Sequence, residues 1–209
     1  MIETKVLAVR YLANASPALC EGLGVPKEYP SLAMLTTDCD DATYIALDEA
    51  TKAAQVKVCY SRSFYAGAAN ATTPNAGEVI GILAGNTPGI VRSGMEAALS
   101  ALSRVGFQDV GVPCLAHTVS SAGSFLSAEA GVRQGSALAY LIAPPLERMY
   151  AMDAALKAAD VKLCKLYAPP SETNFGGGLL SGSQSACNAA CEAFLQAVAE
   201  VARRPRQEE

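Results

Sequence analysis

The chain has 209 residues, a formal net charge of −4 at pH 7, 51% hydrophobic residues and only 17% charged residues. Its 16 lysines and arginines are scattered rather than clustered, which argues against a nucleic-acid-binding protein. The N-terminal residues 1–5 are polar and the longest apolar runs are short, so we expect neither a signal peptide nor a membrane span, and a cytoplasmic location. Soluble proteins average about 25% charged residues, so the low fraction favours an oligomer whose surface is largely covered.

Apolar runs and helix-start signals predict an alternation of strands and helices. Ser16 and Pro17 begin a short helix, and the acidic run after residue 37 opens a longer one. Thr87 and Ser183 are N-cap candidates for long helices over 87–105 and 183–203. Runs of β-branched and apolar residues predict strands at 5–12, 31–37, 56–61, 78–84, 115–120, 136–143, 161–167 and 179–180.

The most informative feature of the sequence is an internal repeat. The segment 46–59 matches 151–164, 105 positions later, with nine of 14 residues identical. A strand precedes the match in both halves, and a glycine-rich loop, a strand and a long helix follow it. The chain is therefore predicted to be α/β (α+β), with two duplicated domains at 1–108 and 109–209, each a mixed sheet flanked by helices. Such duplication often builds a pseudo-symmetric ring from fewer chains.

Common catalytic and cofactor signatures are missing from the sequence. The only histidine, His117, has no evident nucleophile partner, and neither a phosphate-binding loop nor a dinucleotide-binding glycine motif occurs. The seven cysteines follow no pairing or ligand spacing, although Cys187 and Cys191 lie one helical turn apart. We therefore expect no enzyme activity, no cofactor and no metal. Acid–base catalysis needs only two carboxylates, so the absence of motifs does not settle this point.

One acidic cluster is a candidate for ligand binding. Asp38, Asp40 and Asp41 fall within four residues, where a strand gives way to a helix. A single aspartate would satisfy helix capping. Three acids repel one another, so a ligand cation is an equally good explanation of the cluster.

Two long loops occupy equivalent places in the repeat, at 61–77 and 168–178. Both combine glycines with amide and aromatic residues, and loops of this length are usually functional or disordered. Glycines would supply hinges, while Phe64, Tyr65 and Phe175 are large enough to plug an opening. The alternative is an ordinary surface loop.

Several longer motifs resemble one family of proteins. They are Thr37–Tyr44, Leu47–Ala54, Arg62–Ala68, Ala76–Val79, Ala139–Glu147, Asp153–Asp160, Ser171–Phe175 and Ser181–Cys187. With these motifs the chain resembles the EutL family of shell proteins from ethanolamine-utilisation microcompartments over nearly its whole length. The resemblance implies two circularly permuted microcompartment domains, a homotrimeric pseudohexamer in the microcompartment shell, and a gated central pore for metabolites.

The resemblance also implies particular site residues and partners. Asp40 and Glu78 would contact an ethanolamine-like cation in a small acidic pore, with Phe107 as an aromatic contact. The pore gate would include Phe64, Tyr65, Asn70, Glu172, Asn174 and Phe175. The expected partners are further copies of the chain, other shell proteins and a small molecule such as ethanolamine, without nucleic acid or membrane.

Two other functions are compatible with the residues. Duplicated small α/β units also occur in ligand-sensing regulatory proteins, which do not form two-dimensional layers as shell proteins do. A lyase or hydrolase could use Asp40 and Glu78 as its acid and base, and would turn over amino alcohols.

Overall fold

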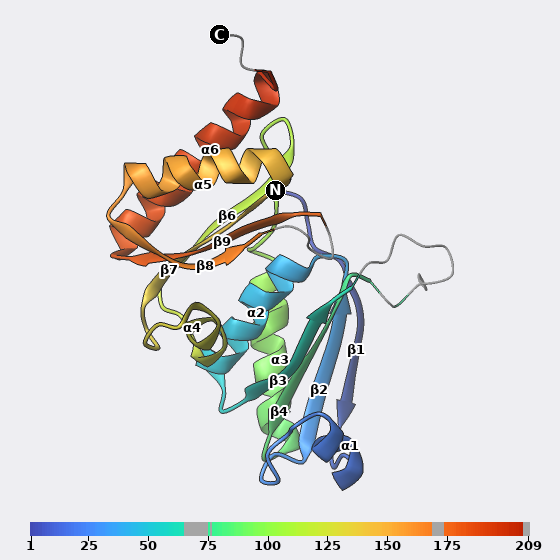
Figure 1. Ribbon diagram of the computed structural model, residues 1–209. Helices are drawn as coiled ribbons and strands as arrows, with labels where there is room; N and C mark the ends of the chain where they lie inside the picture. The colour runs from blue at the N-terminus through green and yellow to red at the C-terminus, as the bar shows by residue number, and fades with distance from the viewer. Residues whose placement is uncertain (65–74, 76, 169–173, 207–209) are drawn as a thin grey trace. The chain divides into compact units, whose positions relative to one another are not determined.

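The computed structural model describes residues 1–64, 75, 77–168 and 174–206. The chain divides into two compact units (Figure 1). The first unit consists of Glu3–Val105 with Gly123–Leu126, and the second of Met1–Ile2, Gly106–Ala122 and Ser127–Glu209. Each unit is therefore built mainly, but not wholly, from one half of the sequence.

The first unit contains a four-stranded sheet in the order β1-β2-β4-β3. Its strands are β1 (Val6–Leu12), β2 (Ser31–Thr37), β3 (Lys57–Ser63) and β4 (Val79–Gly85). Every pairing between them is antiparallel. We expected a sheet with both parallel and antiparallel pairings, and this detail was wrong. Strand β4 lies between β2 and β3, so it separates the two strands that would otherwise pair in parallel. The helical crossover from β2 to β3 therefore leaves these two strands parallel in direction but not paired.

Helices pack on the first sheet according to the alternation of its side chains. Helices α2 (Asp40–Ala53) and α3 (Pro88–Leu102) pack against each other and on one face of the sheet (Figure 1). On the other face, Leu32 and Ile82 pack with Cys20 of the short helix α1 (Pro17–Gly22). Because successive strand residues point to opposite faces, burial on both sides explains why β2 and β4 are apolar almost throughout.

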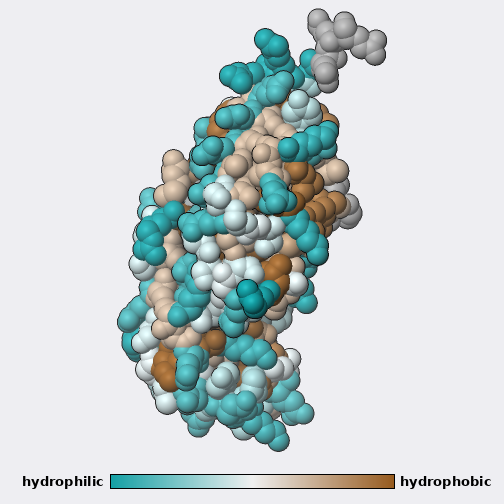
Figure 2. Space-filling model, turned by 90° about the vertical axis from the view of Figure 1, so that its left-hand side faces the viewer, coloured by the Kyte–Doolittle hydropathy of each residue, from teal (hydrophilic) through white to brown (hydrophobic). Residues whose placement is uncertain are grey.

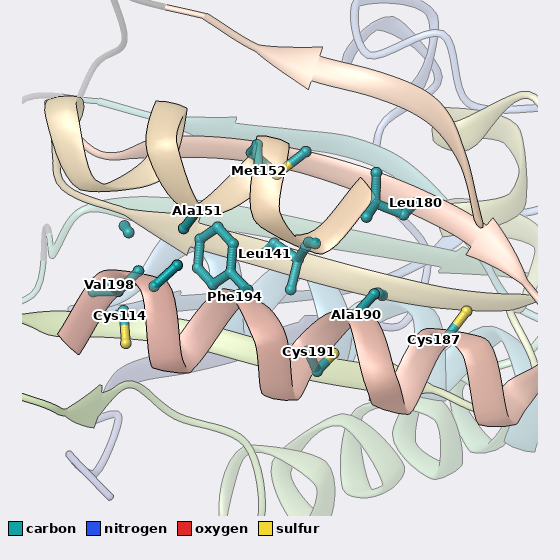
Figure 3. Close-up of a cluster of buried hydrophobic side chains, with 14 of the residues drawn as sticks. Cys114, Leu141, Ala151, Met152, Leu180, Cys187, Ala190, Cys191, Phe194 and Val198 are labelled. Atoms are coloured by element: carbon teal, nitrogen blue, oxygen red, sulfur yellow. The ribbon is translucent and has the colours of Figure 1, made fainter. Parts of the chain in front are cut away.

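The second unit repeats this plan around a sheet in the order β5-β6-β7-β9-β8, also antiparallel at every pairing. Helices α5 and α6 pack together on one face, and Phe194 of α6 lies beside Ala151 and Leu141 in the buried core between them and the sheet (Figure 3). The elements are β5 (Gln108–Asp109), β6 (Pro113–Val119), α4 (Ser124–Ala130), β7 (Ala137–Ala143), α5 (Pro145–Ala158), β8 (Val161–Tyr167), β9 (Gly176–Gly182) and α6 (Gln184–Arg203).

Residues 123–126 join the first unit through a buried carboxylate. The side chain of Asp48, which is fully buried, accepts hydrogen bonds from the backbone N–H groups of Gly123 at 2.7 Å and Leu126 at 2.8 Å. A buried charge is costly unless hydrogen-bonded, and these two donors satisfy that need. This segment comes from the second half of the sequence but packs on the helix α2 of the first half.

The glycine run 176–178 is a strand rather than the hinge we expected. It opens β9, which lies between β7 and β8. A Cβ at Gly177 would lie 1.8 Å from the carbonyl oxygen of Leu141, and one at Gly176 would lie 1.9 Å from the buried guanidinium of Arg148. These glycines are therefore explained by close packing of neighbouring groups.

Hydrophobic residues remain on the surface in separate patches. Figure 2 shows one face on which hydrophobic patches are interspersed among hydrophilic and neutral residues. The large apolar side chains that are most exposed within elements include Leu146, Met149 and Tyr150, all on α5. Among the described residues, no helix is both long enough and apolar enough to span a bilayer.

We predict that Gly177→Ala destabilises the protein by about 1–3 kcal/mol or more, because overpacking must displace the β7 backbone. Gly89→Ala in α3 is the matched control. A Cβ there would meet no atom within 4 Å, so the variant should be neutral or more stable by up to about 1 kcal/mol. Urea denaturation measures both changes. Equal stability of the two variants would contradict the packing explanation.

Candidate functional site

The acidic cluster lies at the turn from β2 into α2. Cys39 is the extended N-cap residue, and its N–H donates to Thr37 Oγ1 at 3.2 Å. The hydroxyl groups of Thr37 and Thr43 are hydrogen-bonded at 2.7 Å, which ties the end of the strand to the first turn of the helix. Asp40 and Asp41 therefore begin α2, where negative charge interacts favourably with the helix dipole.

The aspartates of the cluster make different contacts. Asp38 Oδ1 accepts the backbone N–H of Lys5 at 2.7 Å, so this carboxylate fixes the chain just before β1. Asp40 Oδ1 accepts the N–H of Asp41 at 2.9 Å, a local contact in the first turn of α2. The N-cap position is held by Cys39, whose side chain makes no capping hydrogen bond, so Asp40 satisfies one N–H of the helix start without acting as the N-cap.

Backbone hydrogen bonds fix Glu78 next to the end of β2 and to the residue that follows β3. Its N–H donates to the carbonyl of Thr37 at 2.8 Å, and its carbonyl accepts the N–H of Phe64 at 3.0 Å. The preceding Gly77 has φ of 64°, and a Cβ there would lie 1.9 Å from the Thr37 carbonyl oxygen. Only glycine fits this position, so the close approach fixes Glu78 beside the strand that leads into the acidic cluster.

The carboxylates of this site act on one another. Burial raises the pKa of Glu78, and the negative charges of Asp40 and Asp38 raise it further. Glu78 therefore lies within the electric field of the cluster, as its assignment to the same site requires. A cation placed nearby would therefore stabilise the charged form of Glu78.

Sequence reasoning missed Tyr44 as a neighbour of the site. Burial raises the pKa of its phenol to about 12, the side-chain hydrogen bond with Ser63 opposes this shift, and the charges of Asp40 and Asp41 add to it. Tyr44 follows Asp40 by one helical turn, and that spacing was the available signal. Ser63 ends β3, whose position relative to α2 was not evident from the sequence.

Phe107 belongs to the second unit, whereas Asp40 and Glu78 belong to the first. Its ring contacts that of Phe175 edge to face, with centroids 5.5 Å apart. Its carbonyl accepts the N–H of Ile2 at 2.6 Å. The role of Phe107 as a ligand contact remains a prediction.

The predicted gate residues are only partly described. Phe64 follows β3 directly, and Phe175 precedes β9. Asn174 is exposed and has φ of 65°, a left-handed conformation that asparagine tolerates better than most residues. Tyr65, Asn70 and Glu172 lie outside the described residues, as do most of the predicted loop 61–77 and residues 169–173 of the loop 168–178.

The described residues give little support to a metal site. Among them, no three His, Cys, Asp or Glu side chains are grouped so that they could hold a metal ion. Cys187 and Cys191 are buried in the core of the second unit, and Cys191 Sγ lies 3.4 Å from Thr118 Oγ1 (Figure 3). Their helical spacing is explained by packing on the sheet.

Comparisons with known proteins identify the family. The model of the BMC domain matches residues 31–112. The bacterial microcompartment shell protein EutL of Clostridium perfringens is 57% identical over 98% of this chain and 97% of the relative. The bacterial microcompartment shell protein EutL of Escherichia coli is 47% identical over 99% of this chain and 97% of the relative. The chain belongs to the EutL family of bacterial microcompartment shell proteins.

Solved structures agree with this assignment. The crystal structure of EutL from Leptotrichia buccalis matches with a TM-score of 0.96 and 55% identity, over 99% of this chain and 98% of that one. The crystal structure of EutL from Clostridium perfringens matches with a TM-score of 0.93 and 57% identity, over 98% of this chain and 95% of that one. The predicted family, the duplicated α/β fold and the shell function are therefore confirmed, and the ligand-sensing alternative is not favoured.

We predict that Asp40→Asn lowers the pKa of Glu78, because it removes one of the two negative charges that raise it. Asp41→Asn is the matched control, since Asp41 is not among the causes of the shift. Carboxyl carbon NMR shifts followed across acidic pH measure the effect. Identical Glu78 titrations in both variants would show that Asp40 does not act on Glu78.

The raised pKa of Glu78 also makes the stability of the fold depend on pH. A raised carboxyl pKa means that the folded state binds the proton more tightly than the unfolded chain does. The contribution of Glu78 to stability is therefore largest at low pH and falls as pH rises through its folded pKa. Glu78→Gln should remove this dependence.

Proposed function

We propose that this shell protein is a non-enzymatic homotrimer, a pseudohexamer of six domains with a gated central pore, and that its acidic cluster binds an ethanolamine-like cation. The observation that carries the ligand proposal is that Glu78, half-buried and hydrogen-bonded through its N–H to the Thr37 carbonyl, lies within the electrostatic range of Asp40 and Asp38. Burial raises its pKa, and the two negative charges raise it further. The proposed partners are further copies of the chain, other shell proteins of the microcompartment and small metabolites of the ethanolamine pathway.

Chemistry supports a protonated amino alcohol as the ligand. An ammonium group donates charge-assisted hydrogen bonds to carboxylates, each worth about 1.5–3 kcal/mol. Two such bonds suit an affinity from millimolar to micromolar, as expected of a molecule that must bind and leave again. Phe107 is proposed as an aromatic contact of the same ligand.

The site also offers a physical link to the gate. Glu78 follows the first predicted loop, and its carbonyl is hydrogen-bonded to Phe64 at the loop's other end. A ligand can shift a gate only by its differential affinity for the two states. We propose that a cation bound at Asp40 and Glu78 favours one arrangement of the loop that Phe64 begins.

The catalytic alternative uses the same two carboxylates. An acid–base pair would have to turn over amino alcohols, whereas a binding site would release them unchanged. Shell relatives are structural proteins, and this supports the binding proposal. Incubation of the purified protein with ethanolamine, followed by product analysis, separates the two.

Calorimetric titration with ethanolamine tests the binding site, with ethylene glycol as the uncharged control. We predict that Asp40→Asn and Glu78→Gln each weaken ethanolamine binding by about tenfold or more, since about 1.4 kcal/mol corresponds to one decade. Asp160→Asn, an exposed aspartate of the second unit, should bind as the wild type does. Equal affinity for ethanolamine and ethylene glycol would contradict the proposed carboxylate site, but it would not affect the family assignment.

The pH dependence of binding follows from the direction of the Glu78 shift. Binding should weaken as pH falls through the raised pKa of Glu78, because a protonated carboxyl no longer attracts the ammonium group. The Glu78→Gln variant should lose this part of the dependence. Titrations of both proteins at several acidic pH values measure it, and parallel pH profiles would exclude Glu78 from the site.

A further inference from the structure

The second unit contains a buried cation that lacks an acceptor. The side chain of Arg148 is only 1% exposed, and its nitrogens Nε, Nη1 and Nη2 are the only buried side-chain polar atoms of the described residues without a hydrogen-bond partner. Burial lowers the pKa of Arg148, but an arginine stays protonated at neutral pH. Because a buried charge is destabilising unless it is paired, this guanidinium is suited to a ligand that supplies the acceptor.

The repeat shows what stands at the same position in the first unit. Arg148 is the fourth residue of α5, as Thr43 is of α2. Thr43 is also buried, but its hydroxyl is hydrogen-bonded to that of Thr37, the last residue of β2. The corresponding strand β7 ends at Ala143, whose side chain has no polar atom. The second unit thus has a cation where the first has a satisfied hydroxyl.

The start of α5 lacks the side-chain capping of α3 and α6. Its N-cap residue is Pro144, which makes no side-chain cap, whereas Thr87 and Ser183 cap the other two helices. Glu147 stands at the third helical position, where a glutamate usually accepts the N–H of the N-cap residue, but proline has none. Helix N-termini attract negative charge. The uncapped end and the guanidinium of Arg148 therefore both favour an anion.

The sequence makes room for this guanidinium at the start of β9. A Cβ at Gly176 would lie 1.9 Å from Arg148 Nη1 and 2.5 Å from the carbonyl oxygen of Tyr167, so only glycine leaves space for the arginine. Among the described residues, no carboxylate forms an ion pair with Arg148. Glu147 is its neighbour in sequence, and adjacent residues of a helix do not face each other.

We propose that Arg148 and the first turn of α5 bind a small carboxylate. The two oxygens of a carboxylate lie in one plane and match the planar fork of a guanidinium in two parallel hydrogen bonds. One arginine balances the single charge of a carboxylate, whereas phosphate carries more than one charge at neutral pH. Because the nitrogens are buried, the anion enters only when neighbouring groups move apart, which limits the site to small molecules.

The two units then have sites of opposite charge at corresponding places. The first has Asp38, Asp40 and Glu78 around the start of α2, and the second has Arg148 at the start of α5. The carboxylate site stands on the unpaired guanidinium alone. It requires neither the proposed ethanolamine site nor the proposed trimer.

Acetate tests the site through the melting temperature, which a ligand raises when it binds only the folded protein. We expect sodium acetate to raise the melting temperature of the wild type above its value in sodium chloride of equal ionic strength, with saturation. Arg148→Met, which removes the charge, should show no difference between the two salts. Arg133→Met, at an exposed arginine of the same unit, is the matched control and should respond as the wild type does. Equal responses of the wild type and Arg148→Met would overturn the proposal.

Two further measurements test the chemistry of the site. Arg148→Lys keeps the charge but not the planar fork, and should bind acetate about tenfold more weakly in calorimetric titration. In chloride alone, Arg148→Met should melt at or above the wild-type temperature, because an apolar side chain replaces an unpaired buried charge. A lower melting temperature would show that the chain itself supplies the acceptor, and would overturn the proposal. A larger response to phosphate than to acetate would overturn the assignment to a carboxylate.

Exchanging the ligands separates this site from the acidic one. Glu78→Gln should keep the response to acetate, and Arg148→Met should keep the binding of ethanolamine. A wild type that binds acetate but not ethanolamine would contradict the acidic site and support this one. A wild type that binds ethanolamine but shows no specific response to acetate would overturn the carboxylate site alone.

Discussion

The buried carboxylate of Asp48 determines which parts of the chain form the first unit. A buried aspartate without hydrogen-bond donors would cost several kcal/mol, and its donors come from Gly123 and Leu126, more than 70 residues further along. The first unit is therefore completed by a segment of the second half of the sequence. The corresponding helix α5 has the same acid one repeat later, with its carboxylate exposed.

Much of the fold could be predicted because its signals are local. Thr87 and Ser183 accept the N–H groups of Ile90 and Ala186, so both N-caps are confirmed. The repeat over 46–59 and 151–164 correctly predicted equivalent helices and strands. Strand order and the donors of Asp48 depend on contacts distant in sequence, and local patterns carry no information about them. For the same reason the glycine run 176–178 was interpreted as a hinge: its constraint is the neighbouring backbone and Arg148, not its own sequence.

The acidic site shows the same division between local and distant information. The cluster at Asp38–Asp41 is visible in the sequence, and its position at a strand-to-helix turn followed from the apolar pattern. Glu78 was assigned through resemblance to a family, and the structure explains its position by the positive φ of Gly77 and the close approach to Thr37. The contribution of Tyr44 became evident only once α2 and β3 were placed beside each other. The proposed binding of a cation rests on the electrostatic coupling among these groups.

Duplication lets one chain carry two versions of each surface, and the two versions can then diverge. The first repeat has the acidic cluster at the start of its helix, where the second has Pro145 and Leu146. The first therefore has the residues for the proposed ligand site, while the second presents exposed apolar side chains on α5, among them Leu146 and Tyr150.

The most direct test of this account is the structure of the assembled protein by electron cryomicroscopy. With ethanolamine present, we predict rings of three chains with the ligand bound at Asp40 and Glu78 of each chain. Dispersed single chains, or rings in which this site stays empty at saturating ethanolamine, would contradict it.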